Sequence, residues 1–356
     1  MSISSRYLRQ TSLESFGIEN QAKLSDSQVL IIGMGGLGIP VANYLNAMGV
    51  GTIGIMDNDT IELHNLQRQV LYTEEDLGKS KLNIALKKLK IQNSNTIIKA
   101  FSEFLTTENA LKVIKDFDVI VDATDNFATR YLINDACVIL KKPFIYGALH
   151  AFEGQVSVFN FQDGPTYRCL FPDMPKTNEI PNCDENGVLG VLPGIIGTLQ
   201  ALEVVKVITG IGEILSGKLL LFDGLTQTTQ KIGFKLRPKN QEINKLQKDY
   251  CSVGCTIENI LGSESFEFLY SKEDVQLVDV RNPDEFESYH LEKAVNIPLS
   301  DLTANIKKID FTKPVYLICQ SGIRSEKALQ FLQKAYSKTA IYSVSGGMNK
   351  LQSLCH

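Results

Sequence analysis

Four glycines follow a short apolar run near the amino end of the chain, and their spacing is typical of a turn that binds phosphate. These glycines are Gly33, Gly35, Gly36 and Gly38. They lie between the strand-like run VLII and the helix-compatible stretch IPVANYLNAMG, and bare backbone there lets phosphate oxygens reach amides at a helix start. Asp57 ends the next apolar run, TIGIMD, where an acid would meet a ribose hydroxyl. The alternative is a tight turn without a ligand, and the pattern alone does not separate NAD from ATP.

Charged side chains elsewhere favour ATP. A dehydrogenase has no need of clustered cations, whereas Arg68, Lys81 and Arg9 could converge on a triphosphate. Asp125 and Asn126 follow the strand-like run DVIVDAT, so we expect them in the crevice at the carboxyl end of a strand. A carboxylate at Asp125 suits a magnesium ion that bridges phosphates. Each residue alone could be a surface charge or a strand-end cap, and it is their combination that indicates ATP.

A reactive thiol is predicted near the other end of the chain. Cys319 ends the apolar run PVYLIC and begins the loop CQSGIRS, which a helix-like stretch follows. Backbone amides and the helix dipole stabilise an anionic sulfur at such a position, and Arg324 adds positive charge. The alternative is a thiol buried as a small hydrophobic residue. We favour the reactive thiol because the flanking residues are polar and include glycine.

The elements that must position these residues form two α/β units. Strand-like and helix-like segments alternate over residues 28–150, which predicts a parallel sheet with helices on its faces. The runs GQVSVFNF and KLLLFDG look antiparallel, and a loop at 162–187 separates them before an apolar helix. The polar stretch 237–256 marks a boundary, and a smaller α/β unit follows at 257–356.

Composition excludes several classes of protein. A chain of 356 residues suggests two domains, because one core rarely grows past roughly 300 residues. The net charge of −4 gives no basic surface for nucleic acid, and no run approaches the roughly 18 apolar residues of a membrane span. The start MSISSRYLRQ lacks the apolar core of a signal peptide, so we expect a cytoplasmic protein. The seven scattered cysteines indicate thiols, metal ligands or catalytic groups rather than a disulfide framework.

Several segments resemble the MoeB/ThiF family of ubiquitin-activating-type adenylyltransferases. They occur in family order over nearly all of residues 5–250: RYLRQ, GMGGLG, DNDTIELHNLQRQ, DATDNFATRYLIND and GVLG…GTLQALEVVK. The resemblance implies a Rossmann-like ATP-binding domain with a mixed sheet at 1–250. It also implies ATP-dependent adenylation of the C-terminal glycine of a small ubiquitin-like sulfur carrier protein.

The same resemblance implies roles for single residues. Gly36 and Asp57 would contact the nucleotide, the latter through the ribose. Lys81 would polarise the phosphates, and Asp125 would hold Mg²⁺. Arg9 matches an arginine that reaches the nucleotide of the partner subunit in the family, which implies a homodimer. The residues implied to face the phosphates are Asn65, Gln67 and Arg68.

The carboxyl-terminal unit resembles a single rhodanese domain, a small α/β sulfurtransferase fold. The segments that carry this resemblance are LVDVRNPDEFESYHLEKAVNIPLSDL, CQSGIRS and SVSGGMNKL. It implies that Cys319 carries a persulfide. Two residues depart from the family pattern, Tyr289 in place of a usual glycine and Leu351 in place of a usual tryptophan. We expect Asp279 and Arg281 to stabilise the scaffold.

Together the two resemblances imply that the Cys319 persulfide attacks the acyl-adenylate and leaves sulfur on the carrier as a thiocarboxylate. The implied persulfide donor is a cysteine desulfurase or another protein, and the implied pathway is molybdopterin, thiamin or tRNA thiolation. Cys183 matches a resolving or conjugating cysteine of some members, although it could also be a spectator thiol. Two rival hypotheses are an NAD-dependent oxidoreductase and a non-enzymatic scaffold that binds the carrier.

A structural zinc site of the family is incomplete in this sequence. The family often holds zinc with two Cys-x-x-Cys pairs, which supply four thiolates in tetrahedral geometry. Here Thr166 replaces the first ligand, and the second pair is stretched to Cys251-Ser-Val-Gly-Cys255. Cys169 completes a set of three thiolates, and Cys183 or a water is the remaining candidate for the fourth position. We predict that the protein contains no stoichiometric zinc.

Overall fold

The chain divides into two compact units, Met1–Ser252 and Val253–His356, which are described separately. The computed structural model describes residues 5–174, 187–248, 250, 260–262, 265–266, 269–270, 275–336 and 339–354. All structural statements below concern these residues.

The first unit is built around an eight-stranded mixed sheet with the order β3-β2-β1-β4-β5-β6-β7-β8. Neighbouring strands run parallel from β3 to β5 and antiparallel from β5 to β8. The mixed sheet predicted from the sequence is therefore confirmed. Its strands are β1 (Gln28–Ile32), β2 (Thr52–Met56), β3 (Ile97–Phe101), β4 (Val119–Asp122), β5 (Phe144–His150), β6 (Glu153–Phe159), β7 (Lys218–Asp223) and β8 (Thr228–Gly233).

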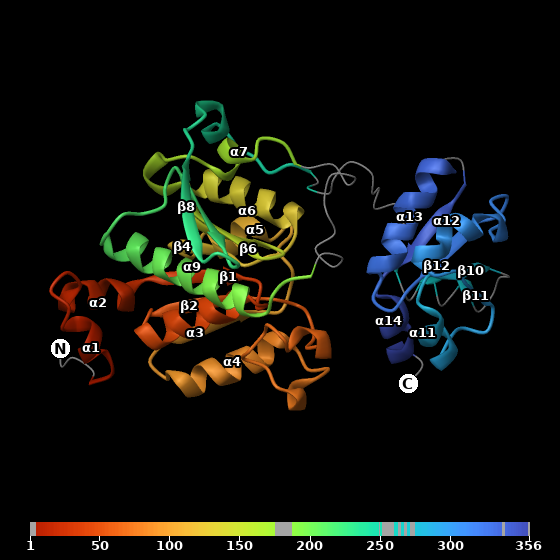
Figure 1. Cartoon of the computed structure of the whole chain (residues 1–356), viewed down its shortest axis with the longest axis horizontal. Coiled ribbons are helices and arrows are strands. Elements are labelled where there is room, and N and C mark those ends of the chain that lie inside the picture. Colours follow the sequence, from red (N-terminus) through yellow and green to blue (C-terminus); the bar gives the residue numbers. More distant parts are fainter. Residues whose placement is uncertain are drawn as a thin grey trace. The chain divides into compact units, whose positions relative to one another are not determined.

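Helices cover both faces of this sheet, with α3, α4 and α9 on one face and α5 and α6 on the other (Figure 1). The central strands are apolar on both faces because each face packs against helices. The helices are α1 (Leu8–Thr11), α2 (Gly17–Asp26), α3 (Gly38–Met48), α4 (Lys81–Gln92), α5 (Ala110–Ile114), α6 (Phe127–Leu140), α7 (Tyr167–Leu170) and α9 (Val191–Thr209).

Two helices of this unit, α7 and α9, go beyond what the sequence predicted. Within the stretch expected to be a loop at 162–187, Tyr167–Leu170 forms the short helix α7. This helix forms because the Thr166 side chain accepts a hydrogen bond from the Cys169 amide and caps its start. Helix α9 is long and apolar enough to cross a membrane, but half of its apolar window is buried inside the fold. Burial of this kind is expected for a core helix.

The second unit contains a five-stranded, all-parallel sheet with the order β11-β10-β12-β13-β9. Apolar clusters on both faces of this sheet pack against the helices. Leu351 is buried in one of them, so it fills the position where a tryptophan was expected. The elements are β9 (Ile260–Leu261), β10 (Gln276–Asp279), α11 (Pro283–Ser288), β11 (Ala294–Asn296), α12 (Leu302–Asn305), β12 (Val315–Ile318), α13 (Ile323–Ala335), β13 (Ile341–Val344) and α14 (Gly347–Leu354).

Candidate functional site

The glycine turn between β1 and α3 requires residues without side chains. Gly33 has a φ of +97°, and a β-carbon there would lie 2.6 Å from the carbonyl oxygen of Ala123, just after β4. A β-carbon at Gly38 would lie 1.9 Å from the Gly33 carbonyl oxygen. A β-carbon at Gly36 would lie 2.9 Å from Pro193 on α9, whereas one at Gly35 would have more space. The turn is therefore packed tightly between β4 and α9, at the carboxyl ends of β1 and β4.

Asp57 follows β2 and is tied to the glycine turn. One carboxylate oxygen accepts a hydrogen bond from the Met34 amide at 2.7 Å, and the other accepts one from the Asp59 amide at 2.8 Å. Burial raises the pKa of Asp57, although these two amides and the charge of Lys81 act in the opposite direction. Asp57 thus holds the turn in place, and its contact with ribose stays a prediction.

Lys81, at the first position of α4, is buried and forms an ion pair with Asp59 at 2.9 Å. The Tyr72 hydroxyl lies 2.9 Å from the Met34 carbonyl oxygen and 3.3 Å from that of Lys81, which ties the start of α4 to the glycine turn. Because Lys81 is also close enough to Asp57 to act on its charge, the structure brings these predicted residues together. Asp59 was not predicted from the sequence, although an acidic residue two positions after Asp57 was the available signal.

The segment that carries Asn65, Gln67 and Arg68 lies beside the same turn. Asn65 is buried and accepts the Glu62 amide within the 3₁₀ helix Leu63–Asn65. The Arg68 guanidinium donates to the His64 carbonyl oxygen at 3.0 Å, and the Arg68 stem lies next to Gly36. Gln67 is exposed, and its backbone lies against Gly190 at the start of α9.

Asp125 is exposed just after β4, and buried residues fix the backbone that leads to it. Asp122, at the end of β4, accepts the amide of Thr124 at 3.0 Å and its hydroxyl at 2.6 Å. Arg130 on α6 donates to the Thr124 carbonyl oxygen at 2.9 Å and lies 3.7 Å from the Asp122 carboxylate. Thr124 is therefore held from two sides. The Asn126 side chain accepts the Thr129 amide and caps α6, a role that was not predicted from the sequence.

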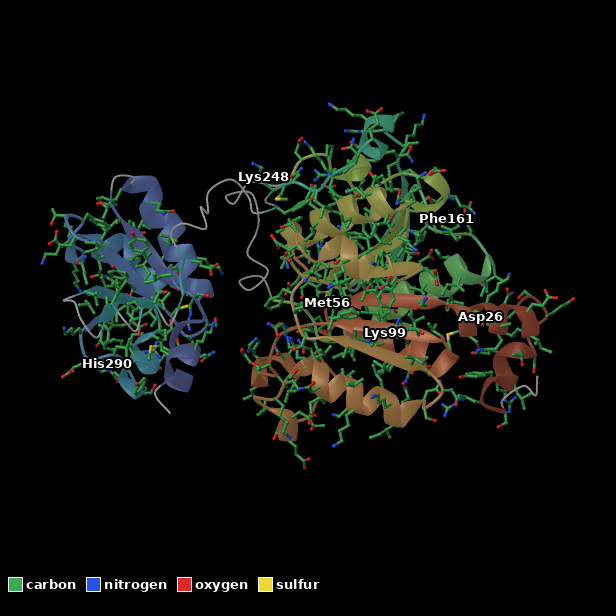
Figure 2. The ribbon with its side chains drawn as sticks, turned by 180° about the vertical axis from the view of Figure 1, so that it is seen from behind. Asp26, Met56, Lys99, Phe161, Lys248 and His290 are labelled. Atoms are coloured by element: carbon green, nitrogen blue, oxygen red, sulfur yellow. The ribbon has the colours of Figure 1, made fainter. Side chains whose placement is uncertain are left out.

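Arg9 is not brought together with these residues in one chain. It lies on α1, where the neighbouring Gln10 donates to the carbonyl oxygen of Met48 at the end of α3. Because α3 runs antiparallel to the strands, its end lies at the amino edge of the sheet. Figure 2 labels Met56 and Asp26, which mark the carboxyl and amino edges. Arg9 is thus on the edge opposite the glycine turn.

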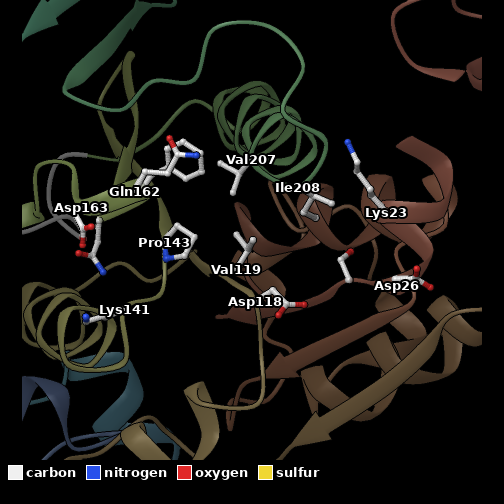
Figure 3. A pocket seen from close by; sticks show the side chains of 13 residues that line it. Lys23, Asp26, Asp118, Val119, Lys141, Pro143, Gln162, Asp163, Val207 and Ile208 are labelled. Carbon is white, nitrogen blue, oxygen red and sulfur yellow. The ribbon is translucent and has the colours of Figure 1, made fainter. Parts of the chain in front are cut away.

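A cavity of about 700 Å³ also lies at the amino edge (Figure 3). Its lining includes Ser27, Asp118 and Pro143, which immediately precede or begin β1, β4 and β5. Val207 and Ile208 of α9 add apolar surface. None of the residues predicted to bind nucleotide lines this cavity, so it is separate from the site at the carboxyl edge.

In the second unit, Cys319 lies directly after β12 at the start of the loop that leads into α13. Its sulfur accepts the Gly322 amide at 3.1 Å, as predicted for a loop that stabilises an anionic sulfur. The expectation that polar neighbours would keep this thiol from being buried is wrong, because its side chain has no exposed surface. The segment at the start of α14 closes over the loop: Met348 donates to the Cys319 carbonyl oxygen at 2.9 Å. A β-carbon at Gly347 would lie 2.1 Å from that oxygen.

Two ion pairs surround the Cys319 loop. Asp279 and Arg281 are fully buried and paired at 2.7 Å, so they stabilise the scaffold as the sequence predicted. The Arg324 guanidinium forms two hydrogen bonds of 2.6 Å with the carboxylate of Glu285 on α11. This contact lowers the pKa of Glu285. The positive charge predicted at Arg324 is therefore present but already paired.

The cysteines of the incomplete zinc set are only partly described. Cys251 and Cys255 lie outside the described residues, as does Cys183. The Cys169 sulfur is within hydrogen-bond distance of the Thr166 and Arg237 amides, at 3.4 and 3.3 Å, and of the Asn240 side-chain nitrogen at 3.5 Å. Burial alone would raise the pKa of Cys169, but the Thr166 hydroxyl, which lies 3.4 Å from the sulfur, and these other donors together lower it. In the described ranges no group of three His, Cys, Asp or Glu residues gathers, and the absence of zinc stays a prediction for metal analysis.

Comparison with known proteins gives two family matches. The model of the ThiF family matches residues 7–251, and that of the rhodanese-like domain matches residues 264–354. The adenylyltransferase and sulfurtransferase MOCS3 of Aedes aegypti is 40% identical, over 94% of this chain and 83% of the relative. The protein of the same name from Anopheles gambiae is 39% identical, over 92% of this chain and 81% of the relative.

Solved structures support the fold of the first unit. Escherichia coli MccB crystallised with ATP is 23% identical, with a TM-score of 0.58 over 67% of this chain and 73% of that chain. MccB with MccA-N7isoASN has a TM-score of 0.61 at 23% identity, over 69% of this chain and 76% of that chain. At this identity the likeness supports the fold alone.

Proposed function

Because the chain belongs to the ThiF family and carries a rhodanese-like domain, we propose that it activates and then sulfurates one protein substrate. The substrate is a small ubiquitin-like sulfur carrier protein. Its C-terminal glycine is first adenylated with ATP, and the adenylate is then replaced by sulfur. The observation that carries this proposal is made in one chain: Arg68 and Lys81 lie beside a glycine turn, Asp125 follows the neighbouring strand β4, and Cys319 begins a loop whose Gly322 amide donates to its sulfur.

Adenylation needs no nucleophile from the enzyme. A carboxylate oxygen of the carrier attacks the α-phosphorus of ATP, and pyrophosphate leaves with the electron pair of the broken P–O bond. The residues of the chain therefore position the reactants and stabilise charge. We assign the nucleotide to Gly33, Gly35, Gly36, Gly38 and Asp57, and the phosphates to Asn65, Gln67, Arg68 and Lys81.

The Asp125 region fits a bound magnesium ion. Asp125 is exposed at the carboxyl end of β4, beside Thr124, whose backbone is fixed by Asp122 and Arg130. An exposed carboxylate on a rigid strand end is a suitable oxygen ligand for Mg²⁺. When bound, the ion would offset negative charge on the phosphates. Asp125 would hold it, and Asn126 would keep α6 capped behind it.

The Cys319 loop supplies the sulfur. The outer sulfur of a Cys319 persulfide attacks the acyl carbon, and AMP leaves with its electron pair, which gives an acyl disulfide. A second thiol, as its thiolate, then attacks the Cys319 sulfur and forms a disulfide with it, while the acyl disulfide S–S bond breaks and the thiocarboxylate leaves with its electron pair. Cys183 is our candidate for that thiol. The persulfide donor we propose is a cysteine desulfurase or another protein with a persulfide.

We further propose a homodimer, a cytoplasmic location and separate domains at 1–250 and 257–356. Arg9 supports the dimer, because it lies at the edge of the sheet opposite the glycine turn and so would serve the pocket of another copy. Joining the two domains in one chain raises the effective concentration of the Cys319 persulfide near the adenylate, so sulfur transfer needs no separate encounter between two proteins.

Carrier-dependent exchange between ATP and pyrophosphate tests this function. Candidate ubiquitin-like carriers of the molybdopterin, thiamin and tRNA-thiolation types would each be offered with ATP and labelled pyrophosphate. We expect exchange with at least one carrier and none with a carrier that lacks its C-terminal glycine. Exchange with no carrier, or binding of NAD in place of ATP, would contradict the proposal.

A further inference from the structure

A row of buried hydroxyl groups leads to the sulfur of Cys319. Ser325, in the first turn of α13, lies with its oxygen 3.6 Å from the Cys319 sulfur. Ser343, on β13, donates to the Ser325 oxygen at 2.8 Å. Both serine side chains are fully buried. Buried hydroxyl groups next to a reactive atom are notable because each must keep its hydrogen bonds satisfied without water.

The Ser325 hydroxyl has two neighbours to which it can donate, the Gly322 carbonyl oxygen and the Cys319 sulfur when that sulfur is a thiolate. In the structure its hydroxyl donates to the Gly322 carbonyl oxygen at 2.8 Å, so the serine oxygen is free to accept from the Cys319 thiol. The same carbonyl oxygen also accepts the Glu326 amide at 3.0 Å. The Gly322 carbonyl oxygen therefore keeps a hydrogen-bond donor when the Ser325 hydroxyl rotates away from it, so this rotation costs little free energy.

We propose that Ser325 is the two-way hydrogen-bond partner of the reacting sulfur: it accepts from the Cys319 thiol and donates to the Cys319 thiolate. A hydrogen bond to a charged group is worth roughly twice a neutral one, so the hydroxyl turns to the sulfur when the sulfur is anionic. Ser343 continues to donate to Ser325 in both states. That second bond polarises the Ser325 hydroxyl and strengthens its bond to the thiolate.

This inference rests on the proposed sulfur transfer through Cys319. During loading, the Cys319 thiolate attacks the outer sulfur of a donor persulfide, the donor S–S bond breaks, and the electron pair leaves on the donor thiolate. During discharge to cyanide, cyanide attacks the outer sulfur of Cys319 persulfide. Thiocyanate forms, and the electron pair of the S–S bond returns to Cys319. Both steps pass through the anionic Cys319 sulfur, to which Ser325 and the Gly322 amide would donate.

Charged groups also surround the Cys319 loop. Arg324 on α13 is close enough for its charge and that of Cys319 to interact, and it is paired with Glu285 on α11. Asp279 on β10 is paired with Arg281, whose guanidinium donates to the Gln320 side chain in the loop at 3.0 Å. None of these four groups is removed by changing a serine, so a serine variant isolates the hydroxyl contribution.

The test is the pH dependence of Cys319 alkylation by iodoacetamide in the full-length protein, followed by mass spectrometry of the Cys319 peptide. We expect Ser325→Ala to raise the midpoint of alkylation by about one pH unit, a tenfold change in thiolate population. Ser343→Ala should raise it by a smaller amount, and Ser325→Thr should restore the wild-type midpoint. Ser321→Ala is the matched control, because Ser321 is an exposed hydroxyl in the same loop.

A second readout is the rate at which cyanide removes sulfur from preloaded Cys319 persulfide, which should fall severalfold in Ser325→Ala. An alkylation midpoint in Ser325→Ala equal to that of Ser321→Ala would overturn the inference. If Ser325→Ala does not fold, an unchanged midpoint in Ser343→Ala would overturn it instead. Alkylation needs no sulfur donor, so wild-type protein that takes up no sulfur would contradict the proposed function without affecting this result.

Discussion

The two reactive regions of this chain hold their key groups in opposite ways. At the carboxyl edge of the first sheet, Asp125 is exposed, and the residues proposed for the nucleotide site come from several separate elements. In the second unit, Cys319 is fully buried, and its contacts come largely from one short loop and the first turn of the helix that follows.

This difference follows from the chemistry proposed for each region. Adenylation moves charge among phosphates that arrive with the substrate, so the protein needs charged groups facing a ligand. Sulfur transfer builds charge on an atom of the protein itself, so that atom must be solvated by the protein. The first region is therefore sensitive to the loss of single charges, and the second to the loss of local hydrogen bonds.

The largest expected effect in the first region comes from Asp125→Ala. We expect carrier-dependent ATP–pyrophosphate exchange to fall by about 100-fold or more, because preorganised charge at the phosphates is lost. Thiocarboxylate formation should stop as well, since the persulfide has no adenylate to attack. Asp116→Ala is the matched control, because Asp116 is an exposed acid on the segment that precedes β4. Equal exchange rates in the two variants would show that Asp125 does not contribute to adenylation.

The next largest effect is expected from the buried residues that hold the backbone before Asp125, and it concerns stability as well as activity. Asp122→Asn leaves Arg130 buried without its charged partner, and breaking such a pair typically destabilises a fold by about 3 kcal/mol. Urea unfolding of the full chain, with Asp116→Asn as control, measures this loss. Exchange activity should fall even where the variant is folded, because Arg130, which also donates to the Thr124 carbonyl oxygen, loses the charge that positions it. A stable, fully active variant would show that this pair does not position Asp125.

A smaller effect tests whether the first region is completed by a second copy. Arg9→Ala and Arg68→Ala proteins should each be weak in exchange, whereas Arg6→Ala, on the neighbouring turn, should not be. After subunits of the two weak variants are mixed, about a quarter of wild-type activity should return. Half of randomly exchanged dimers are mixed, and each has one intact pocket of two. Activity no higher than that of the separate variants would count against a shared site.

The smallest expected effect is the pH dependence of the Glu285–Arg324 pair. Arg324 lowers the pKa of Glu285 in the folded state below its ordinary 4.5. The pair therefore stabilises the fold above pH 4.5, and this contribution is lost as pH falls through the lowered pKa. Glu285→Gln should lower the free energy of unfolding by no more than about 1 kcal/mol at pH 7, because the pair is partly exposed. The difference from wild type should vanish in strong acid, and a constant difference at all pH values would contradict this account.

Parts of the molecule with strong local patterns could be predicted from the sequence. The apolar run, glycines and helix-compatible stretch at residues 28–49 correspond to β1, the turn and α3. Asp57 and Cys319 each follow a strand, as their position after an apolar run indicates. These features depend on neighbours within a few residues, so composition and spacing are enough to find them.

Contacts between distant segments could not be predicted in the same way. The Asp59–Lys81 ion pair depends on how the segment between β2 and α4 folds back. Cys319 is buried in part because Met348, far along the chain, closes over its loop. The loop itself has the polar composition of an exposed segment, so its sequence predicts an exposed Cys319 side chain, whereas the structure buries it. Ser325 was expected only as the last residue of that loop, and its hydrogen bond with Ser343 depends on a strand that lies 18 residues further along the chain.

The central claim is that adenylation and sulfur transfer are separate reactions of one chain, and Cys319→Ser tests it most directly. Carrier-dependent ATP–pyrophosphate exchange and thiocarboxylate formation would be measured on the same preparation of this variant. We predict exchange close to that of wild type and no thiocarboxylate, because the adenylation residues lie in the first unit and the sulfur is lost from the second. Loss of exchange in a folded Cys319→Ser protein would contradict the claim.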